Sequence, residues 1–590
     1  MSETNQPAKE RAQWNTRFGF ILAAAGSAVG LGNIWKFPYI TGENGGGWFV
    51  LIYLVCIALV GLPIMMAEIM IGRAAQRQPI TAFEKLQGKK TPWAAVGWLG
   101  VICGFIILSY YIVVAGWSMD YTLKSVANFT DEIFSSAKVD GYEYRAKTTM
   151  DQMRSDLVKR RAEVLRHQAE APVKNQAAAS YFSEYERFRA AVDASPDPAL
   201  ARERLLEKPK LKAIVEEVEL LLPKLDAIAS EASTQAKAEI ALLTDLEVRD
   251  QAEALARRNQ ISEEVGKRFG GLATDGWASS FWALLFILVT ILIVAGGVSK
   301  GIERACRFLM PTLICLIIFM VIYGMFQPGF GQAVNFVFQP DLSRLKPSGV
   351  LEALGHAFFT LSLGMGAMIT YGSYQREKKG LAATSCWIAL FDTGIALLAC
   401  LMIFPIIFSY GMEPHGGPGL VFVSMPLAFA EIGTGGLLLS ILFFGLLVFA
   451  ALTSSISLLE VLCSYCIDGL NWSRQRSAWV VGGLVFLFGT LSAFAMSEGF
   501  ALASWEPGFG KNFFDTMDYL ASNWMLPIGG LFIAVYAGWF MPAKIRNAEL
   551  VGLSPILVSG WLILIRFIAP LLVLAVVADK VGILHIDELF

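Results

Sequence analysis

Charged residues are scarce in this 590-residue chain, at 17% against 55% hydrophobic residues, and the mean hydropathy is +0.53. This composition argues against a water-soluble protein. The 48 basic and 50 acidic residues leave a net charge of −2, so no basic excess exists to neutralise a nucleic-acid backbone. We therefore expect no nucleic-acid partner.

Cysteine and histidine give no sign of a disulfide framework or a metal centre. The eight cysteines all lie in apolar stretches, where a thiol behaves as a small hydrophobe. Cys463 and Cys466 form one CxxC pair, but no second pair or nearby histidine completes a zinc site. Neither a disulfide-stabilised fold nor a structural metal is predicted.

Long apolar runs fill most of the chain. Each is about 20 residues or longer, enough to cross ~30 Å of hydrocarbon as a helix, and backbone groups in lipid must pair within the segment. The eleven runs cover residues 15–40, 45–72, 93–125, 277–298, 304–327, 350–375, 381–410, 436–468, 477–497, 514–541 and 554–580. The sequence predicts an all-α polytopic protein with eleven transmembrane helices in a lipid bilayer.

Basic residues indicate the orientation. Short loops after the even-numbered spans carry clusters that include Arg73 and Arg77, whereas the opposite short loops offer little beyond Arg344, Lys346 and Lys511. The positive-inside rule puts the N-terminus in the cytoplasm and, after eleven spans, the C-terminus outside. The predicted parts are a cytoplasmic tail (1–13), helices 1 to 3 (14–128), an extracytoplasmic insertion (129–275), helices 4 to 11 (276–582) and an extracytoplasmic tail (583–590).

The insertion between helices 3 and 4 differs from the rest of the chain. Roughly half of all charged residues fall between about 129 and 269. Apolar residues at helical spacing, among them Leu211, Val215, Val218 and Leu222, predict helical hairpins of coiled-coil type. Two interpretations stay open: a docking or regulatory module with a protein partner, or an elaboration that packs only on itself.

Two spans are interrupted near mid-membrane. The first contains GSAVGLGN from Gly26 and the sixth contains FTLSLGMG from Phe359. Glycine weakens a helix by about 1 kcal/mol relative to alanine. Because the interruptions are five helices apart, they predict a 5+5 inverted repeat whose broken helices face one central site. The alternative is that the small residues only permit close helix packing.

An unwound helix offers carbonyl oxygens and positive dipole ends, so one site can hold a cation and a carboxylate together. An amino acid with sodium satisfies such a site. Asn33, Thr360, Thr453 and Ser454 supply further oxygens. Asp392 is an intramembrane carboxylate, which is a functional candidate by default, although a protonated residue in a helix-helix hydrogen bond is the alternative.

Several ordered motifs resemble those of the neurotransmitter:sodium symporter family. They are Trp14, GSAVGLGNIWKFPY from Gly26, ENGGGWF from Glu43, the pair Tyr110-Tyr111, FFTLSLGMGAMITYGSY from Phe358 and LTSSIS from Leu452. They lie on both sides of the insertion. The resemblance implies a leucine-transporter-like fold, alternating access, import driven by the sodium gradient and a prokaryotic inner (plasma) membrane.

The resemblance also implies site residues. A first sodium site would use Ala28, Asn33, Thr360 and Asp392 with the substrate carboxylate, and a second would use carbonyls of Gly26, Val29 and Ala450 with hydroxyls of Thr453 and Ser454. Substrate-binding residues would be Ser27, Ala28, Leu31, Gly32, Ile107, Tyr111, Phe359, Thr360, Ser362, Met365, Ser454 and Leu458. Gly30 stands where amine-transporting relatives carry an aspartate, so a substrate with its own carboxylate is expected. The apolar lining implies a neutral, hydrophobic L-amino acid, aliphatic or aromatic.

Gates follow from the same resemblance. Lys36 with Asp518 would close the outer side, and Arg11 with Asp468, near Ser373 and Tyr374 and capped by Trp14, would close the inner side. Each pair could equally be an exposed ion pair, which contributes little. Nine residues separate Gly301 from Pro311, a family pattern for local unwinding that lets water reach the second sodium. A simple loop-to-helix junction explains the same two residues.

Three positions depart from the family pattern. His356 stands where chloride-using relatives have glutamine, Ala396 where serine or glutamate is common, and Asp392 where asparagine is common. The fixed charge of Asp392 can substitute for chloride, so transport without chloride is predicted. His356 either adds a proton-linked step or is a buried, hydrogen-bonded core histidine.

Three functions make different predictions for this sequence. A sodium-coupled importer should lose uptake after Asp392→Ala or Thr453→Ala. A non-transporting amino-acid sensor that signals through the insertion should lose signalling, whereas an importer should keep transport, when residues 135–268 are deleted. A membrane enzyme is disfavoured because no nucleophile with a base and an orienting partner lies within the spans.

Overall fold

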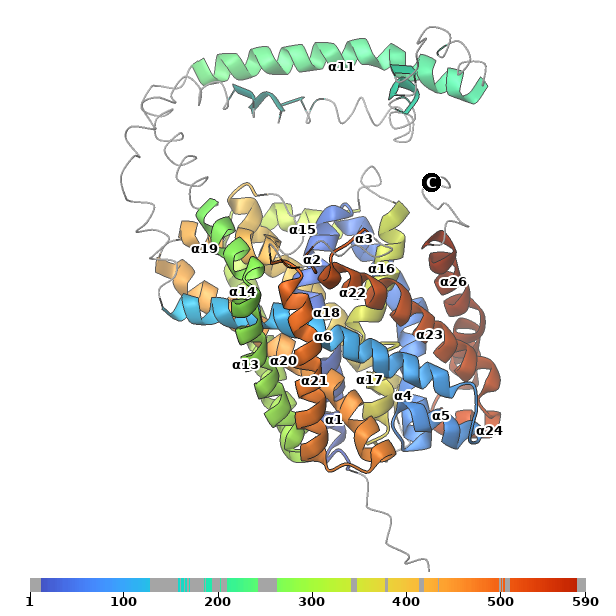
Figure 1. The fold of residues 1–590 in the computed structure, drawn as a ribbon. Helices are drawn as coiled ribbons and strands as arrows, with labels where there is room; N and C mark the ends of the chain where they lie inside the picture. The colour runs from blue at the N-terminus through green and yellow to red at the C-terminus, as the bar shows by residue number, and fades with distance from the viewer. Residues whose placement is uncertain are drawn as a thin grey trace, which may run out of the picture. The chain divides into compact units, whose positions relative to one another are not determined.

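The computed structural model describes residues 12–127, 209–241, 263–340, 347–376, 380–412, 419–432, 434–497 and 510–580, with scattered residues between 158 and 202 and at 500 and 502–503. Two compact units result, one of residues 1–133 and 262–590 and one of 134–261. Within the described ranges all regular structure is helical (Figure 1). Arg11, most of the predicted insertion and the predicted tail at 583–590 lie outside the described residues.

The first unit is a bundle of helices. In chain order they are α1 (Arg17–Ala28), η1 (Gly32–Lys36), α2 (Phe37–Glu43), α3 (Gly47–Cys56), η2 (Ile57–Gly61), α4 (Leu62–Ala75), α5 (Pro79–Gln87), α6 (Ala94–Val126), α13 (Gly276–Ala295), η3 (Val298–Glu303), α14 (Arg304–Met325), α15 (Phe330–Phe338), α16 (Pro347–Thr360), α17 (Ala367–Gly372), α18 (Leu381–Ser409), η5 (Leu420–Ser424), α19 (Met425–Ile432), α20 (Thr434–Leu470), α21 (Arg474–Phe494), α22 (Phe513–Leu520), η6 (Ala521–Met525), α23 (Leu526–Val535), η7 (Tyr536–Phe540), α24 (Ala543–Glu549), α25 (Pro555–Ile563), η8 (Leu564–Ile568) and α26 (Ala569–Lys580), where η marks a π-helical turn.

Nine helices in the described part of the chain are long and apolar enough to cross a membrane. A tenth candidate is a bent pair, Arg17–Ala28 with Gly32–Glu43, whose two halves meet at 49°. These ten overlap ten of the predicted runs. The remaining run, 350–375, covers most of α16 and all of α17, and each of these helices is too short to cross a bilayer alone.

Both predicted interruptions are breaks in the helices. At the first, α1 ends and Val29 is extended, with φ −79° and ψ 102°, before the chain turns into η1. At the second, Ser362, Gly364 and Gly366 have φ of 53°, 78° and 75° between α16 and α17. Glycine adopts these left-handed angles without the strain that a Cβ causes, which explains why glycines concentrate at this break.

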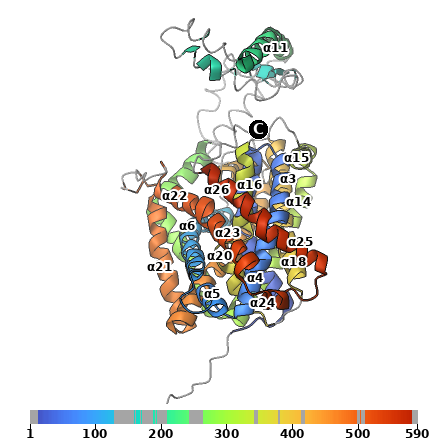
Figure 2. The same cartoon turned by 90° about the vertical axis from the view of Figure 1, so that its right-hand side faces the viewer.

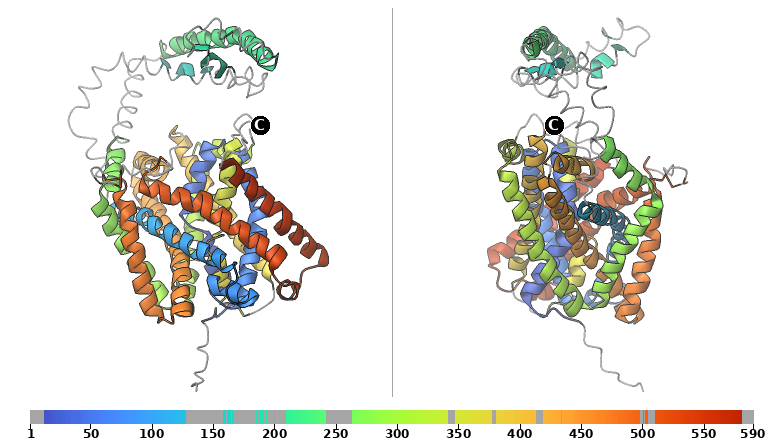
Figure 3. Two further views of the ribbon diagram at one scale, coloured as in Figure 1. Left: turned by 45° about the vertical axis from the view of Figure 1, so that its right-hand side comes forward. Right: turned by 90° about the vertical axis from the view of Figure 1, so that its left-hand side faces the viewer.

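The two breaks lie inside one bundle. The first half of the first broken helix, α1, packs against α14, α18 and α20, and α17 packs against α4 and α20. The long helix α6 packs against α20 and α13, and it is seen beside α20 in Figure 2. The bundle is seen from further sides in Figure 3. Its outer helices expose large apolar side chains such as Trp277, Phe308 and Ile556, as a lipid-facing surface requires.

The second unit contains α11 (Pro209–Ala241), which covers the predicted apolar pattern. One face of α11 packs Val215 and Val218 against Tyr185 and Phe188. Its polar face forms ion pairs, including Arg161 with Glu239 at 2.6 Å. The described residues of this unit contain no second helix of similar length, so coiled-coil hairpins stay a prediction.

Candidate functional site

A small cavity of about 20 Å³ lies between the two helix breaks. Its lining contains no charged side chain and consists of Ser27, Ala28, Gly30, Gly32, Ile107, Tyr111, Phe359, Thr360, Ser362, Met365, Ser454 and Leu458. Eleven of the twelve residues expected around a substrate line this cavity. Leu31 does not; it lines the next cavity outward, and its neighbour Gly30 faces the central one.

Polar groups of both broken helices surround the central cavity. The backbone N–H of Leu31 donates to the Tyr111 hydroxyl at 3.1 Å, so the hydroxyl proton is available to another acceptor. Ser362 donates to the Ser27 carbonyl at 2.7 Å. A Cβ at Gly30 would lie 3.0 Å from Tyr111 Oη and would overlap the Ser454 hydroxyl. The absence of a side chain at position 30 therefore lets the break pack closely on α6 and α20.

Asp392 on α18 is fully buried and joins a polar cluster beside this cavity. Asn33 Nδ2 donates to Asp392 Oδ1 at 2.7 Å and Tyr53 Oη donates to Asp392 Oδ2 at 3.0 Å. Tyr53 Oη also lies 3.1 Å from Thr360 Oγ1. All hydrogen-bond donors that the described structure gives Asp392 are neutral. An ionised carboxylate in such a setting needs a cation nearby.

Three of the four residues expected at a first ion site thus form one network, and the fourth, Ala28, lines the adjoining cavity. No sequence pattern pointed to Tyr53, because a single tyrosine in an apolar run has no periodic or charge signal. We refer to Asn33, Tyr53, Thr360 and Asp392 as the aspartate cluster.

A second oxygen cluster lies where α20 meets the end of α1. Thr453 Oγ1 lies 3.2 Å from the Val29 carbonyl oxygen and 2.9 Å from that of Ala450. Ser454 Oγ lies 3.3 Å from the Val29 carbonyl oxygen and 3.5 Å from that of Gly26. All five predicted ligands therefore converge. A set made only of hydroxyl and carbonyl oxygens suits a hard cation, and we call it the hydroxyl cluster.

A second cavity of about 120 Å³ lies outward of the central one. Tyr111 and Phe359 line both cavities and separate them. At the outer cavity, Lys36 Nζ lies 3.2 Å from Asp518 Oδ2, with side-chain exposures of 17% and 32%. Tyr110 also donates to Asp518 at 2.9 Å. The partial burial and the additional donor distinguish this pair from a freely exposed ion pair.

Aromatic residues cover the opposite end of the bundle. The Trp14 indole N–H donates to the Tyr371 carbonyl at 3.0 Å, and the ring packs edge-on against Tyr371 and Tyr374. Asp468 accepts from the backbone N–H of Gln78 at 3.3 Å. Its expected partner, Arg11, lies outside the described residues.

Two buried carboxylates support this framework, and neither was singled out from the sequence. Glu460 is fully buried, pairs with Arg474 at 2.7 Å and accepts from the Tyr374 hydroxyl at 2.6 Å. Glu68 on α4 accepts from the backbone N–H of Gly364 at 2.7 Å, which satisfies a backbone group freed by the second break. Both could have been noticed as carboxylates inside apolar runs.

Comparisons with known proteins identify relatives of this chain. The family model described as the sodium:neurotransmitter symporter family matches residues 11–185 and 267–587. The uncharacterized sodium-dependent transporter YhdH of Bacillus subtilis is 29% identical, over 97% of this chain and 98% of its own. A bovine sodium- and chloride-dependent taurine transporter is 23% identical over 71% of this chain and 54% of its own. The crystal structure of MhsT in complex with L-phenylalanine superposes with a TM-score of 0.70 at 34% identity, covering 97% of this chain and all of MhsT.

Proposed function

The chain belongs to the sodium:neurotransmitter symporter family, and on that premise we propose that it imports neutral, hydrophobic L-amino acids together with sodium ions by alternating access. Membership makes it a multi-pass, sodium-dependent transporter and not an enzyme. The relatives give no support to the sensor alternative. The identity of the substrate and the ion sites are the parts we propose.

The uncharged cavity between the two breaks is the observation that supports a neutral, hydrophobic amino acid as the substrate. Its lining contributes hydroxyls and apolar groups but no side chain of either charge. With Gly30 in place of an aspartate, nothing in the lining neutralises the ammonium of a substrate that has no carboxylate. In an amino acid the carboxylate would accept from Tyr111 and lie toward the aspartate cluster. Met365 is flexible and can accommodate aliphatic or aromatic side chains.

Two sodium sites fit the two clusters. The first would use the aspartate cluster, Ala28 and the substrate carboxylate, and the second would use the hydroxyl cluster. Because the substrate completes the first site, binding of substrate and sodium would be coupled. Asp392 supplies a fixed negative charge beside the first ion, so we propose that chloride is not required, although the bovine taurine transporter is chloride-dependent.

Alternating access needs a cover on each side of the site. Outward, the covers are Tyr111, Phe359 and the pair of Lys36 with Asp518. Inward, the cover is Trp14 against Tyr371, with the predicted gate around Asp468 and Tyr374. We propose that these covers open in turn, so that the substrate never has a continuous path through the protein.

The topology proposed for this function has eleven spans, with α16 and α17 as one broken helix and a 5+5 inverted repeat. The segments are those predicted above, in a plasma membrane, with the N-terminus in the cytoplasm and the C-terminus and the 129–275 insertion outside. The insertion, with its charged surface and its own small core at Tyr185 and Val215, is free to recruit a protein partner.

A binding panel tests the substrate class. Purified full-length protein is titrated with leucine, phenylalanine, aspartate, lysine and phenethylamine in sodium and in potassium, with thermal stabilisation as the readout. We expect stabilisation by leucine or phenylalanine in sodium only. Equal stabilisation by phenethylamine, which lacks the carboxylate, would contradict the proposed coupling of substrate and ion.

A further inference from the structure

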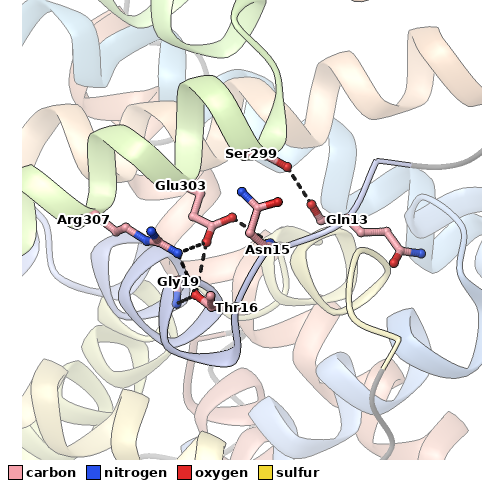
Figure 4. Close-up of polar contacts among 7 residues, drawn as sticks. All are labelled: Gln13, Asn15, Thr16, Gly19, Ser299, Glu303 and Arg307. Atoms are coloured by element: carbon pink, nitrogen blue, oxygen red, sulfur yellow. Dashed lines mark hydrogen bonds and ion pairs between the residues drawn. The ribbon is translucent and has the colours of Figure 1, made fainter.

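A buried carboxylate joins α14 to the residues that precede α1. Glu303 ends the π-helical turn η3, and its side chain is 1% exposed. Its Oε2 accepts from the backbone N–H of Asn15 at 2.9 Å, and its Oε1 accepts from the Thr16 hydroxyl at 3.2 Å (Figure 4). Glu303 therefore lies at the N-terminal end of α1, where the helix dipole favours a negative charge.

Neighbouring residues extend this contact. Thr16 is the N-cap of α1 and accepts from the backbone N–H of Gly19 at 2.9 Å. Arg307 donates to Glu303 at 2.6 Å and to Thr16 at 2.8 Å. Ser299 donates to the carbonyl of Gln13 at 2.9 Å. We refer to Gln13, Asn15, Thr16, Ser299, Glu303 and Arg307 as the Glu303 cluster.

Gly19 gives independent support for this contact. A Cβ at Gly19 would overlap the carboxylate of Glu303. The carboxylate therefore lies directly on the backbone of α1, in the space that the missing side chain leaves. Glycine at position 19 therefore lets the first turn of α1 contact Glu303 closely.

The helix that carries Glu303 departs from regular α-helical hydrogen bonding at its start and at Pro311. Its start is π-helical, a conformation that is rare and frequently found at functional sites. Pro311 has no N–H and leaves the carbonyl of Arg307 without its usual helical donor. Both features lower the free energy needed to unwind residues 301–311.

The same segment also reaches the hydroxyl cluster. A Cβ at Gly26 would lie 3.3 Å from the side chain of Met310 and 3.2 Å from Thr453 Cβ. Gly26 and Thr453 both belong to the proposed second sodium site. Residues 301–311 thus contact α1 at its first turn, through Glu303, and at its broken end, through Met310.

We propose that Glu303 is a positioning residue for the release of the second sodium, because it holds α1 against residues 301–311 while the hydroxyl cluster is intact. This inference rests on the proposed function. Separation of α1 from the segment requires that the bonds to Asn15 and Thr16 break. Glutamine at position 303 keeps the volume, but its amide accepts at only one atom and without charge, so the separated state becomes more populated.

Cys306 is a native reporter of this separation. It lies in the same segment and is 0% exposed. A water-soluble maleimide is added to three proteins: wild type, Glu303→Gln and Arg304→Gln. Each protein is treated once in sodium with L-phenylalanine and once in potassium. Peptide mass spectrometry then measures the labelling of each cysteine. Arg304 is exposed on the same turn and is the matched control. Cys103 on α6, also 0% exposed, reports general unfolding.

We expect Glu303→Gln to label Cys306 roughly tenfold faster than wild type in sodium, the effect of losing one charged hydrogen-bond acceptor, with Cys103 still protected. Arg304→Gln should match wild type. A wild-type rate at Cys306, or an equal increase at Cys103, would overturn the inference. The transporter proposal is tested separately, because it predicts that wild-type Cys306 is labelled more slowly in sodium than in potassium. The proposed transport function and the proposed role of Glu303 can therefore fail independently.

Discussion

Replacement of Asp392 by asparagine isolates the charge of the aspartate cluster. Asparagine has nearly the same shape, and its amide can rotate so that its oxygen accepts from Asn33 and its nitrogen donates to Tyr53. The hydrogen bonds are thus retained, and the lost quantity is the attraction between the carboxylate and the cation. Two unit charges 4 Å apart interact by about 4 kcal/mol at an effective dielectric constant of about 20.

The amide oxygen still coordinates the ion through its dipole, so we expect only part of this attraction to be lost. A loss of about 2 kcal/mol corresponds to a roughly 30-fold weaker sodium affinity. The assay is a sodium titration of L-phenylalanine binding, performed in chloride and in gluconate. Chloride should partly restore the sodium affinity of Asp392→Asn and should not affect wild type.

The matched control is Asp275→Asn. Asp275 is the N-cap of α13 and accepts from the backbone N–H groups of Trp277 and Ala278, a role that asparagine also fills. This variant should keep the wild-type sodium affinity. If Asp392→Asn also keeps it, the assignment of a cation to the aspartate cluster is wrong.

Three further predictions concern binding and stability. Gly30→Ala should abolish amino-acid binding, because the added Cβ would overlap a hydroxyl of α20, whereas Gly394→Ala, with open space around its Cβ, should bind normally in the same titration. Thr453→Ala should weaken the sodium dependence of binding but leave the melting temperature in potassium close to that of wild type; a large drop in potassium would instead indicate a structural hydroxyl. Arg474→Gln should cost about 3–5 kcal/mol of stability by leaving the buried Glu460 without its charged partner, Glu460→Gln should cost less because Arg474 is 20% exposed, and the double variant should cost less than the sum in thermal unfolding.

The spans were predictable because hydropathy alone decides which segments enter a bilayer. The predicted run 93–125 and the helix Ala94–Val126 differ by one residue at each end. The run 350–375 was expected as one interrupted span, and its interruption extends over six residues between α16 and α17. Pattern indicates where glycines weaken a helix, but the length of unwound chain depends on tertiary contacts such as Glu68 with Gly364.

Sequence motifs predicted most residues of the candidate site. They could not predict which side chains face the cavity or which side chains from different helices meet. Leu31 and Gly30 are adjacent, and only the backbone angles of the break determine which one faces the central cavity. Tyr53 reaches Asp392 from another helix, a pairing that no spacing within one segment reveals. The role of Glu303 has no sequence signal for a similar reason, because its partners Asn15 and Thr16 lie almost 290 residues earlier in the chain.

As a symporter, this protein should use an inward sodium gradient to accumulate a hydrophobic amino acid. The most direct test reconstitutes the full-length chain in proteoliposomes and follows radiolabelled phenylalanine and leucine under an inward sodium gradient and an equal potassium gradient. We expect saturable accumulation above equilibrium in sodium only, and we expect Gly30→Ala to abolish it. Equal uptake in both gradients, or sodium-dependent binding without accumulation, would contradict this expectation.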